Sequence, residues 1–575
     1  MNKFFKYFVC ATIVTLGFTA CVQDLDLKPL DKNTTTAFNQ DAVFTKCYAT
    51  LALTGQKGPD GDCDIDDLDE GTSSFYRMHW ELNEFPTDEG WWIWNDVGLA
   101  DIRVMNWNGD NALVKGLYYR FNIDIKLCNH FLAHADVSTP EGQAQAAEVR
   151  FLRALNYWYI LDMFKVVPFS IEESTDYPKF VERAELYGWL VDELEELTEL
   201  LPEQRYSVYR VDRYAAWLLL ARTYLNAKVY LNKSWNDEVV KEAVKNAYDA
   251  ASHALEGHYQ LLTTPTDHTG EGGWYYSAYQ KLFMGDNHAN GAQDEALLLI
   301  YQDGVYCQCW GGSRFLLNTF RDANMVPSGS DDSWSCFRSS PELVAKFVNL
   351  DHASSIKAHE YEMPELLGDD RAILCSYNKY VASVDTLPDG EEEIKYGENT
   401  WNLNGTKSAT FKDCWAVLKF TGVKSTAKTP AESVGSDPHF PDTDIPLLRL
   451  AEAYMIKAEA ALRQGNNGEA LSIVNDVIRA RANANPLPSI NEATMCDEWC
   501  REFYCEGRRR SDLIRFDRFA GPQADAAAYN WEGRYNQTSA AGYKSCAEKW
   551  NWYPIPNDDK ASNPNYELIE GGDGY

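Results

Sequence analysis

The chain has 575 residues, with 53 Lys and Arg against 86 Asp and Glu, so its formal net charge at pH 7 is −33. Nucleic acid is excluded as a partner, because this charge repels a polyanion and the sequence lacks cationic clusters that would hold phosphates. The same charge does not oppose the binding of a neutral ligand.

The first twenty residues have the pattern of a signal peptide. Lys3 and Lys6 precede an apolar run that continues to Phe18, and the segment ends in Thr19-Ala20-Cys21. The run is too short to span a bilayer, and small residues before a cysteine are typical of a lipoprotein cleavage site. The alternative is an N-terminal core helix. The acidic stretch after Cys21 resembles the export signal of bacterial surface lipoproteins, so we expect a lipidated Cys21 to be the only attachment to the outer membrane, with the protein facing the cell exterior.

Residues 21–575 are predicted to form a single unit, because no linker rich in Pro, Ser or Gly divides them. Residues 21–260 contain an early loop segment and helical repeats, and residues 261–575 contain a loop-rich binding part and C-terminal helices. Apolar residues spaced by three and four predict helices over Leu117–Ala135, Gln143–Phe164, Arg183–Leu200, Val211–Leu231, Asp237–Leu255, Ile445–Arg463, Glu469–Arg481 and Met495–Arg515. The predicted fold is mainly α, with tetratricopeptide-like helical hairpins that support an irregular, loop-rich ligand-binding region.

Two stretches lack this helical spacing. Gly55–Asp110 and roughly residues 260–440 are rich in Gly, Asp, Ser and aromatic residues. Long irregular segments in a packed helical protein are usually functional, because ordering them is costly and they add little core. The ligand site is therefore expected in these two stretches.

Several helical segments resemble signatures of the SusD/RagB family. They occur in the family's order, from Glu148–Phe164 through Tyr214–Leu225 and Leu448–Ala460 to Glu502–Leu513. The terminal Tyr553-Pro-Ile-Pro556 and Asn563-Pro-Asn-Tyr566 agree as well. This resemblance implies a protein that captures ligand for a SusC-type TonB-dependent outer-membrane β-barrel transporter, and that is not an enzyme.

Charged residues within these signatures are expected to have a structural role. Charges on apolar helices survive burial only when they are paired. Structural ion pairs are therefore predicted for Arg150, Arg153, Glu452, Glu459, Glu506 and Asp512.

The loops resemble those of starch-binding members of the same family. The segments concerned are Thr54–Gly58, Asp69–Gly71, Phe75–Arg77 and Leu82–Glu89. The resemblance implies binding of α-glucan or malto-oligosaccharides by Asp69, Arg77, Trp92, Trp94, Trp310 and Trp334. At Trp310 an indole stands where the starch-binding members have a tyrosine.

These residue types suit a sugar ligand. The apolar face of a pyranose can stack on an indole, while arginine donates to hydroxyls and aspartate accepts from them. In Gly90-Trp-Trp-Ile-Trp-Asn95 alternate residues of an extended chain point the same way, so Trp92 and Trp94 are expected to share a face. Trp80 and Trp107 are predicted to be core residues instead.

A calcium ion is implied by the same resemblance, with Asp286, Asp442 and Asp444 as its expected ligands. A structural aspartate turn is the alternative for these residues. The cysteines of Cys307-Gln-Cys309 and of the set Cys496, Cys500 and Cys505 lack nearby histidines, which favours free thiols or disulfides over a zinc site.

Two other functions remain open at this stage. A different cargo, such as another glycan or a peptide, would use the same fold with other loop contacts. A glycoside hydrolase would need a carboxylate pair, and no motif in the chain selects one.

Overall fold

The computed structural model describes residues 38–55, 58–59, 63–66, 68–92, 94, 96–321, 327–347, 368–376, 379–386, 392–398, 415–521, 547–568 and 572–575. The predicted signal peptide and Cys21 lie outside these residues. Helix α2 (Gln40–Ala49) is the first described element, and Phe44–Tyr575 form a single unit. Within the described part of the chain, none of the helices combines the length and apolar character needed to cross a membrane.

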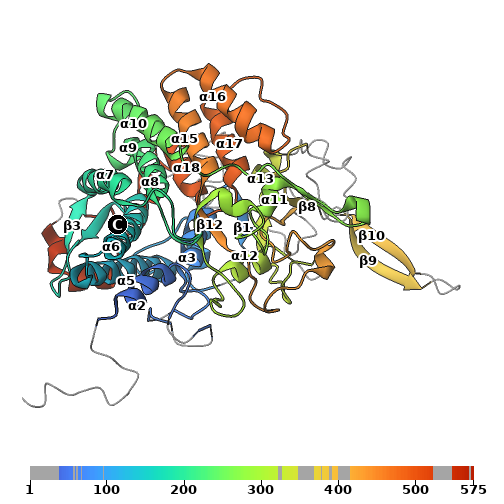
Figure 1. Ribbon diagram of the computed structural model, residues 1–575, viewed down its shortest axis with the longest axis horizontal. Coiled ribbons are helices and arrows are strands. Elements are labelled where there is room, and N and C mark those ends of the chain that lie inside the picture. The colour runs from blue at the N-terminus through green and yellow to red at the C-terminus, as the bar shows by residue number, and fades with distance from the viewer. Residues whose placement is uncertain are drawn as a thin grey trace, which may run out of the picture. The chain divides into compact units, whose positions relative to one another are not determined.

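The long helices pack one after another. Each contacts the next in the series α5 (Ala112–His134), α6 (Pro140–Met163), α7 (Arg183–Leu200), α8 (Arg213–Leu225) and α10 (Glu238–Ala254). Helix α10 packs against α15 (Leu450–Arg463), which packs against α16 (Asn467–Ile473). The two predicted helical regions therefore join into one layer, although a loop-rich region separates them in sequence (Figure 1). The predicted mainly α fold is confirmed.

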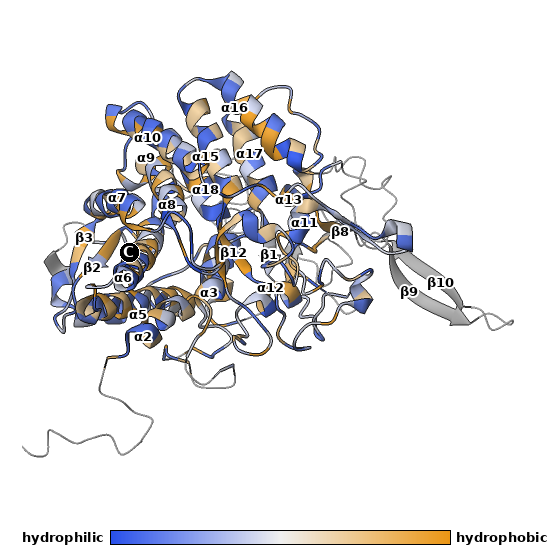
Figure 2. Cartoon of the chain, in the orientation of Figure 1, coloured by the Kyte–Doolittle hydropathy of each residue, from blue (hydrophilic) through white to orange (hydrophobic). Residues whose placement is uncertain are grey.

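Local sequence explains where these helices begin and which face they bury. The side chains of Asn111, Thr139 and Asp212 accept hydrogen bonds from the first-turn backbone amides of α5, α6 and α8. On α10 the buried residues recur every three or four positions, from Val240 to Ala254. Figure 2 shows hydrophobic and hydrophilic residues on the same helices, as this spacing requires.

Short elements complete the described chain. The further helices are α3 (Phe75–Glu84), α4 (Leu99–Arg103), α9 (Ala227–Tyr230), α11 (Ala278–Lys281), α12 (Ser313–Thr319), α13 (Pro341–Ala345), α17 (Glu492–Phe503), α18 (Arg509–Arg515) and α20 (Asn557–Ser562). Six antiparallel strand pairs join β1 (Gly90–Trp92) to β7 (Phe337–Ser339), β2 (Val166–Phe169) to β3 (Lys179–Glu182), β4 (Thr266–Asp267) to β5 (Tyr275–Tyr276), β6 (Ala296–Ile300) to β12 (Ile445–Arg449), β8 (Leu374–Ser376) to β11 (Trp415–Val417) and β9 (Lys379–Thr386) to β10 (Glu392–Glu398).

Several predicted elements differ from those in the structure. The helix expected from Ile445 begins only at Leu450, because Ile445–Arg449 pairs with β6 and Pro446 keeps the preceding Ile445 extended. The helix expected over Met495–Arg515 is broken between α17 and α18, where Cys505 and Gly507 have φ of 58° and 77°. The early loop segment contains α3, whose ten residues are all buried, including Arg77, Glu81 and Glu84, which recur at helical spacing in the sequence.

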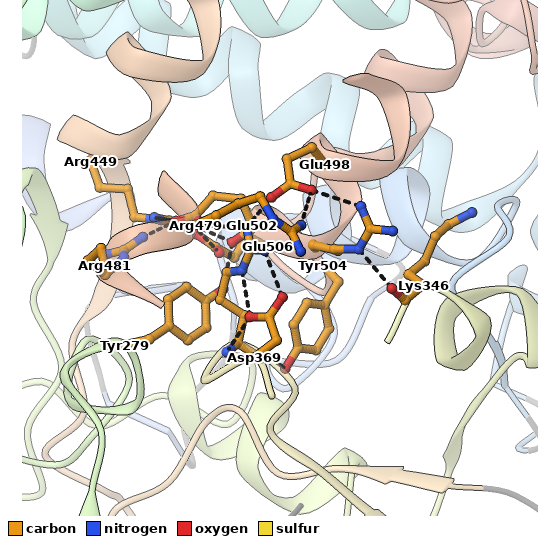
Figure 3. A network of polar contacts seen from close by, with 12 residues as sticks. Tyr279, Lys346, Asp369, Arg449, Arg479, Arg481, Glu498, Glu502, Tyr504 and Glu506 are labelled. Carbon is orange, nitrogen blue, oxygen red and sulfur yellow. Dashed lines mark hydrogen bonds and ion pairs between the residues drawn. The ribbon is translucent and has the colours of Figure 1, made fainter. Parts of the chain in front are cut away.

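The predicted structural ion pairs are confirmed. Arg150 and Arg153 pair with Glu193, Glu452 pairs with Arg222, and Glu459 and Asp512 both pair with Arg515. Glu506 belongs to a buried network around α17. Figure 3 shows Glu502 and Glu506 beside Arg449, and Glu498 beside Arg479. These charges link β12 to α17 through Arg449 and Glu502, and link α15 to α8 and α18 through Glu452 and Glu459.

Candidate functional site

Two predicted site residues, Trp94 and Trp334, form an adjacent pair. The β1–β7 pairing sets Trp92 opposite Phe337, which places the chain just after β1 beside the chain just before β7. The ring centroids of Trp94 and Trp334 are 6.2 Å apart, with an interplanar angle of 33°. Trp94 is 42% exposed and Trp334 is half-buried. Residues 240 positions apart in sequence therefore form one aromatic surface.

Trp92 lies under this surface, so the expectation that it shares an exposed face with Trp94 is wrong. Its side chain is 1% exposed and packs on Phe85 and Phe315, with ring centroids 4.8 and 5.9 Å away. The cause is that β1 ends at Trp92, so the alternation of an extended strand does not continue to Trp94. The indole rings of Trp92 and Trp94 are inclined to each other by 72°. Trp80 and Trp107 are buried, as predicted.

Trp310 joins the aromatic surface through Arg314, which sequence reasoning missed. The Arg314 guanidinium carbon lies 4.7 Å from the ring centroid of Trp310 and 5.9 Å from that of Trp334. Arg314 is 3% exposed, pairs with Asp331 and Asp332 at 3.4 Å, and donates to the carbonyl of His439. The sequence feature that could have identified Arg314 is its position directly after Trp310-Gly-Gly-Ser313.

A close backbone approach fixes Trp310 against the start of α3. The Ser74 hydroxyl donates to the carbonyl of Gly311 at 2.9 Å. A Cβ on Gly311 would lie 2.3 Å from Ser74 Oγ and 2.6 Å from the carbonyl oxygen of Gly71, so only glycine fits. This contact places Trp310 beside the loop that contains Asp69.

Asp69 and Arg77 border the same loop but differ in exposure. Asp69 is exposed, and its carboxylate accepts from the amide and hydroxyl of Thr72, both at 2.9 Å. A Cβ on Gly71 would lie 3.2 Å from both Asp69 Oδ1 and Trp310 Cβ, which shows how close these side chains are. Arg77 is only 9% exposed and donates to Glu81, Asp96 and the carbonyl of Gly71.

The acids around Arg77 shape the electrostatics of this loop. Burial opposes the charged form of Arg77, but Glu81, Asp96 and Asp69 outweigh it and raise its pKa. Burial raises the pKa of Glu81 to about 7, against the lowering effect of Arg77. Arg77 is therefore charged, and its N–H groups hold this loop in place more than they are available to a ligand.

The hydrogen bond to Asp444 and the charges of Asp444, Asp286 and Asp442 raise the pKa of His288, so the three aspartates expected as calcium ligands lie around this imidazole. Asp286 accepts from the amide and hydroxyl of Ser425, and Asp442 accepts from Ser436 and pairs with Lys424 at 3.1 Å. Asp444 accepts from the amide of Gln302 at 2.8 Å. Among the described residues, the group of His, Cys, Asp or Glu ligand atoms that lie within 4.8 Å of one another belongs to His130, His134 and Glu173. Each of the three carboxylates accepts from N–H or O–H donors, and calcium binding by these oxygen ligands stays a prediction.

The cysteines of these two predicted groups are free thiols, which is one of the alternatives that the sequence favoured over a zinc site. Cys307, Cys309, Cys496, Cys500 and Cys505 are free and buried.

Replacing Gly311 by alanine is expected to lower the free energy of unfolding by about 1–3 kcal/mol, because the added Cβ overlaps Ser74 and Gly71. Gly188→Ala is the matched control, since Gly188 lies within α7 with nothing within 4 Å of the added Cβ; it should be neutral or slightly stabilising. Urea unfolding followed by tryptophan fluorescence measures both. Equal changes in the free energy of unfolding for Gly311→Ala and Gly188→Ala would contradict the close approach of Gly311 to Ser74 and Gly71.

Known proteins resemble this chain in sequence and in fold. The model of the SusD family matches residues 317–571. The chain is 36% identical over 604 aligned positions to the starch-binding protein SusD of Bacteroides thetaiotaomicron, and the alignment covers 99% of each chain.

Solved structures share the fold at low sequence identity. A SusD superfamily protein from Parabacteroides distasonis has a TM-score of 0.62 at 16% identity, covering 92% of this chain and 97% of its own. A laminarin-binding SusD-like protein has a TM-score of 0.60 at 18% identity, covering 92% and 99%. Surface glycan-binding protein A from Bacteroides uniformis gives the same score and identity, covering 92% and 98%.

Proposed function

This chain belongs to the SusD family, and from this premise we propose that it binds starch or malto-oligosaccharides at the cell surface and passes them to a SusC-type TonB-dependent transporter of the outer membrane. A lipid on Cys21 would anchor it. The proposed role is capture without bond cleavage, as the family relatives are described by what they bind.

The observation that supports this proposal is the aromatic surface in which Trp94 lies beside Trp334, and Trp334 is linked to Trp310 through Arg314. Indole faces offer apolar area to the C–H face of a sugar ring, and the nearby exposed Asp69 can accept hydrogen bonds from hydroxyls. Trp334 already donates its indole N–H to Asp332 at 2.8 Å, which holds its ring in place.

The choice of an α-glucan depends on the relative that is 36% identical over nearly the whole chain. The fold by itself does not select the glycan, because a structure of the same fold is described as laminarin-binding. Another glycan or a peptide is the alternative cargo, and the experiment below distinguishes them.

Calorimetric titration of the mature protein with maltoheptaose, a β-linked glucan and a peptide mixture tests the proposal. We expect saturable binding of maltoheptaose alone, with a Kd on the order of micromolar to millimolar, because an open surface removes little water and restrains a flexible chain. Longer α-glucans should bind more tightly. Heat from the β-glucan or the peptides without any from maltoheptaose would replace starch by another cargo and leave the family assignment intact.

A further inference from the structure

Two histidines and a glutamate meet at the C-terminal end of α5, in a part of the unit that the proposed carbohydrate site does not use. His130 and His134 are one helical turn apart, so their imidazoles lie on the same face, with ring centroids 4.8 Å apart. Glu173 comes from the loop that follows β2. One carboxylate oxygen lies 2.9 Å from His130 Nδ1 and the other lies 2.9 Å from His134 Nε2.

Buried side chains hold the Glu173 loop against α5. The Asn129 amide, on the same helical turn as His130, donates to the carbonyl of Ser170 at 2.9 Å and to that of Glu172 at 3.3 Å. Arg153 on α6 donates to Asn129 Oδ1 at 2.9 Å and to the carbonyl of Ile171 at 2.8 Å. Asn129 is 4% exposed and Arg153 is 6% exposed. The approach of Glu173 to the two histidines is therefore set by anchored backbone and not by a chance contact of surface side chains.

We propose that His130, His134 and Glu173 bind a divalent transition-metal ion of the zinc type, independently of the carbohydrate surface. Two imidazole nitrogens and one carboxylate are the donor set that zinc prefers, whereas calcium takes oxygen ligands only. The three candidate ligand atoms lie within 4.8 Å of one another. Metal–ligand bonds of about 2.0–2.2 Å require these atoms to draw closer.

The half-exposed side chains can make this adjustment by rotating on their solvent-facing side. Their exposed fractions are 43% for His130, 46% for His134 and 46% for Glu173. The ion would replace the two carboxylate–imidazole contacts and would leave room for water as a further ligand. The formal net charge of −33 attracts cations to the chain in general, which favours the metal-bound over the metal-free state of the site.

Zinc chloride titration by calorimetry tests the site in the mature, tag-free protein after treatment with a chelator. We expect one ion per chain in the wild type. His134→Gln and Glu173→Gln should each weaken binding by at least ~10-fold, a loss seen even for residues that only orient a metal ligand. The matched control is His253→Gln on α10, which removes a histidine paired with Glu256 at 3.1 Å and should leave zinc affinity unchanged.

Cobalt(II) provides a second readout, because its visible absorption reports direct ligation by imidazole. The band should appear in the wild type and in His253→Gln, and should be lost in His134→Gln while far-UV circular dichroism stays unchanged. The proposal is overturned if the wild type binds no zinc at millimolar concentration, or if His134→Gln and Glu173→Gln bind it as the wild type does. Equal weakening by His253→Gln would also overturn it.

Discussion

Replacement of Trp334 by alanine is expected to weaken maltoheptaose binding by roughly 30-fold. The indole stacks beside Trp94 at 6.2 Å and near the guanidinium of Arg314, so its loss takes away the middle of the aromatic surface. Central aromatic residues of binding surfaces commonly contribute about 2 kcal/mol, or roughly 30-fold in Kd. For a site at the millimolar end of the expected range, this loss ends saturation in calorimetry, and at the micromolar end it raises the measured Kd by the same factor. Trp94→Ala should act in the same way.

Trp189→Ala is the matched control for this result. Trp189 is half-buried on α7, where it contacts Tyr157 and Phe169 with ring centroids 5.1 Å away, and it has no part in the proposed surface. Its variant should bind maltoheptaose as the wild type does. Retained affinity in a folded Trp334→Ala variant would show that the ligand binds elsewhere on the protein.

Replacement of Glu502 by glutamine is expected to destabilise the protein by about 3–5 kcal/mol at neutral pH. Glu502 is fully buried and pairs with Arg449 at 2.7 Å, with Arg371 at 3.4 Å and with Arg481. The nearly isosteric amide leaves these buried cations without part of their counter-charge, which is the costly way to break a buried pair. Urea unfolding monitored by tryptophan fluorescence measures the effect.

The contribution of Glu502 to stability should depend on pH in a defined direction. Burial opposes its ionisation, but Arg481, Arg449 and Arg371 outweigh burial and lower its pKa from 4.5 to about 2. A group whose folded pKa is depressed stabilises the fold above its unfolded pKa, and this stabilisation is lost as pH falls. The contribution of roughly 3 kcal/mol should be complete above pH 4.5 and should disappear as pH falls from 4.5 to about 2.

The pH series needs an exposed acid as its control. Glu238 pairs with Lys241 on the surface of α10, with 88% of the Glu238 side chain exposed, so Glu238→Gln should change stability by less than ~1 kcal/mol at any pH. If Glu502→Gln follows the Glu238→Gln curve, the buried network does not stabilise the fold as described.

Sequence periodicity identified the long helices because each buries one face. On α10, for example, small apolar residues recur at the helical spacing, and this spacing is visible without tertiary information. Periodicity failed where an element pairs across the chain, since β12 is a strand because β6 lies beside it. Helix α3 was missed although Arg77, Glu81 and Glu84 recur in it at helical spacing.

The candidate site shows the same division. Residue type and resemblance selected Trp94, Trp310, Trp334 and Asp69, which the structure places around neighbouring loops. They could not show that Trp92 is buried, since exposure depends on Phe85 and Phe315, which pack on its ring. The three aspartates expected for calcium were selected by carboxylate spacing and resemblance; each accepts hydrogen bonds from local donors, and calcium binding by them stays a prediction.

The sequence by itself determined the mainly helical fold, the family and the residue types of the proposed sugar surface, because helical spacing, signature order and indole content are properties of the linear chain. Only the tertiary structure decided which tryptophans are exposed, that Arg314 lies between two of them, and that Glu173 meets His130 and His134. These features depend on contacts between segments far apart in sequence, and such contacts form only after strand pairing and helix packing have set the distances.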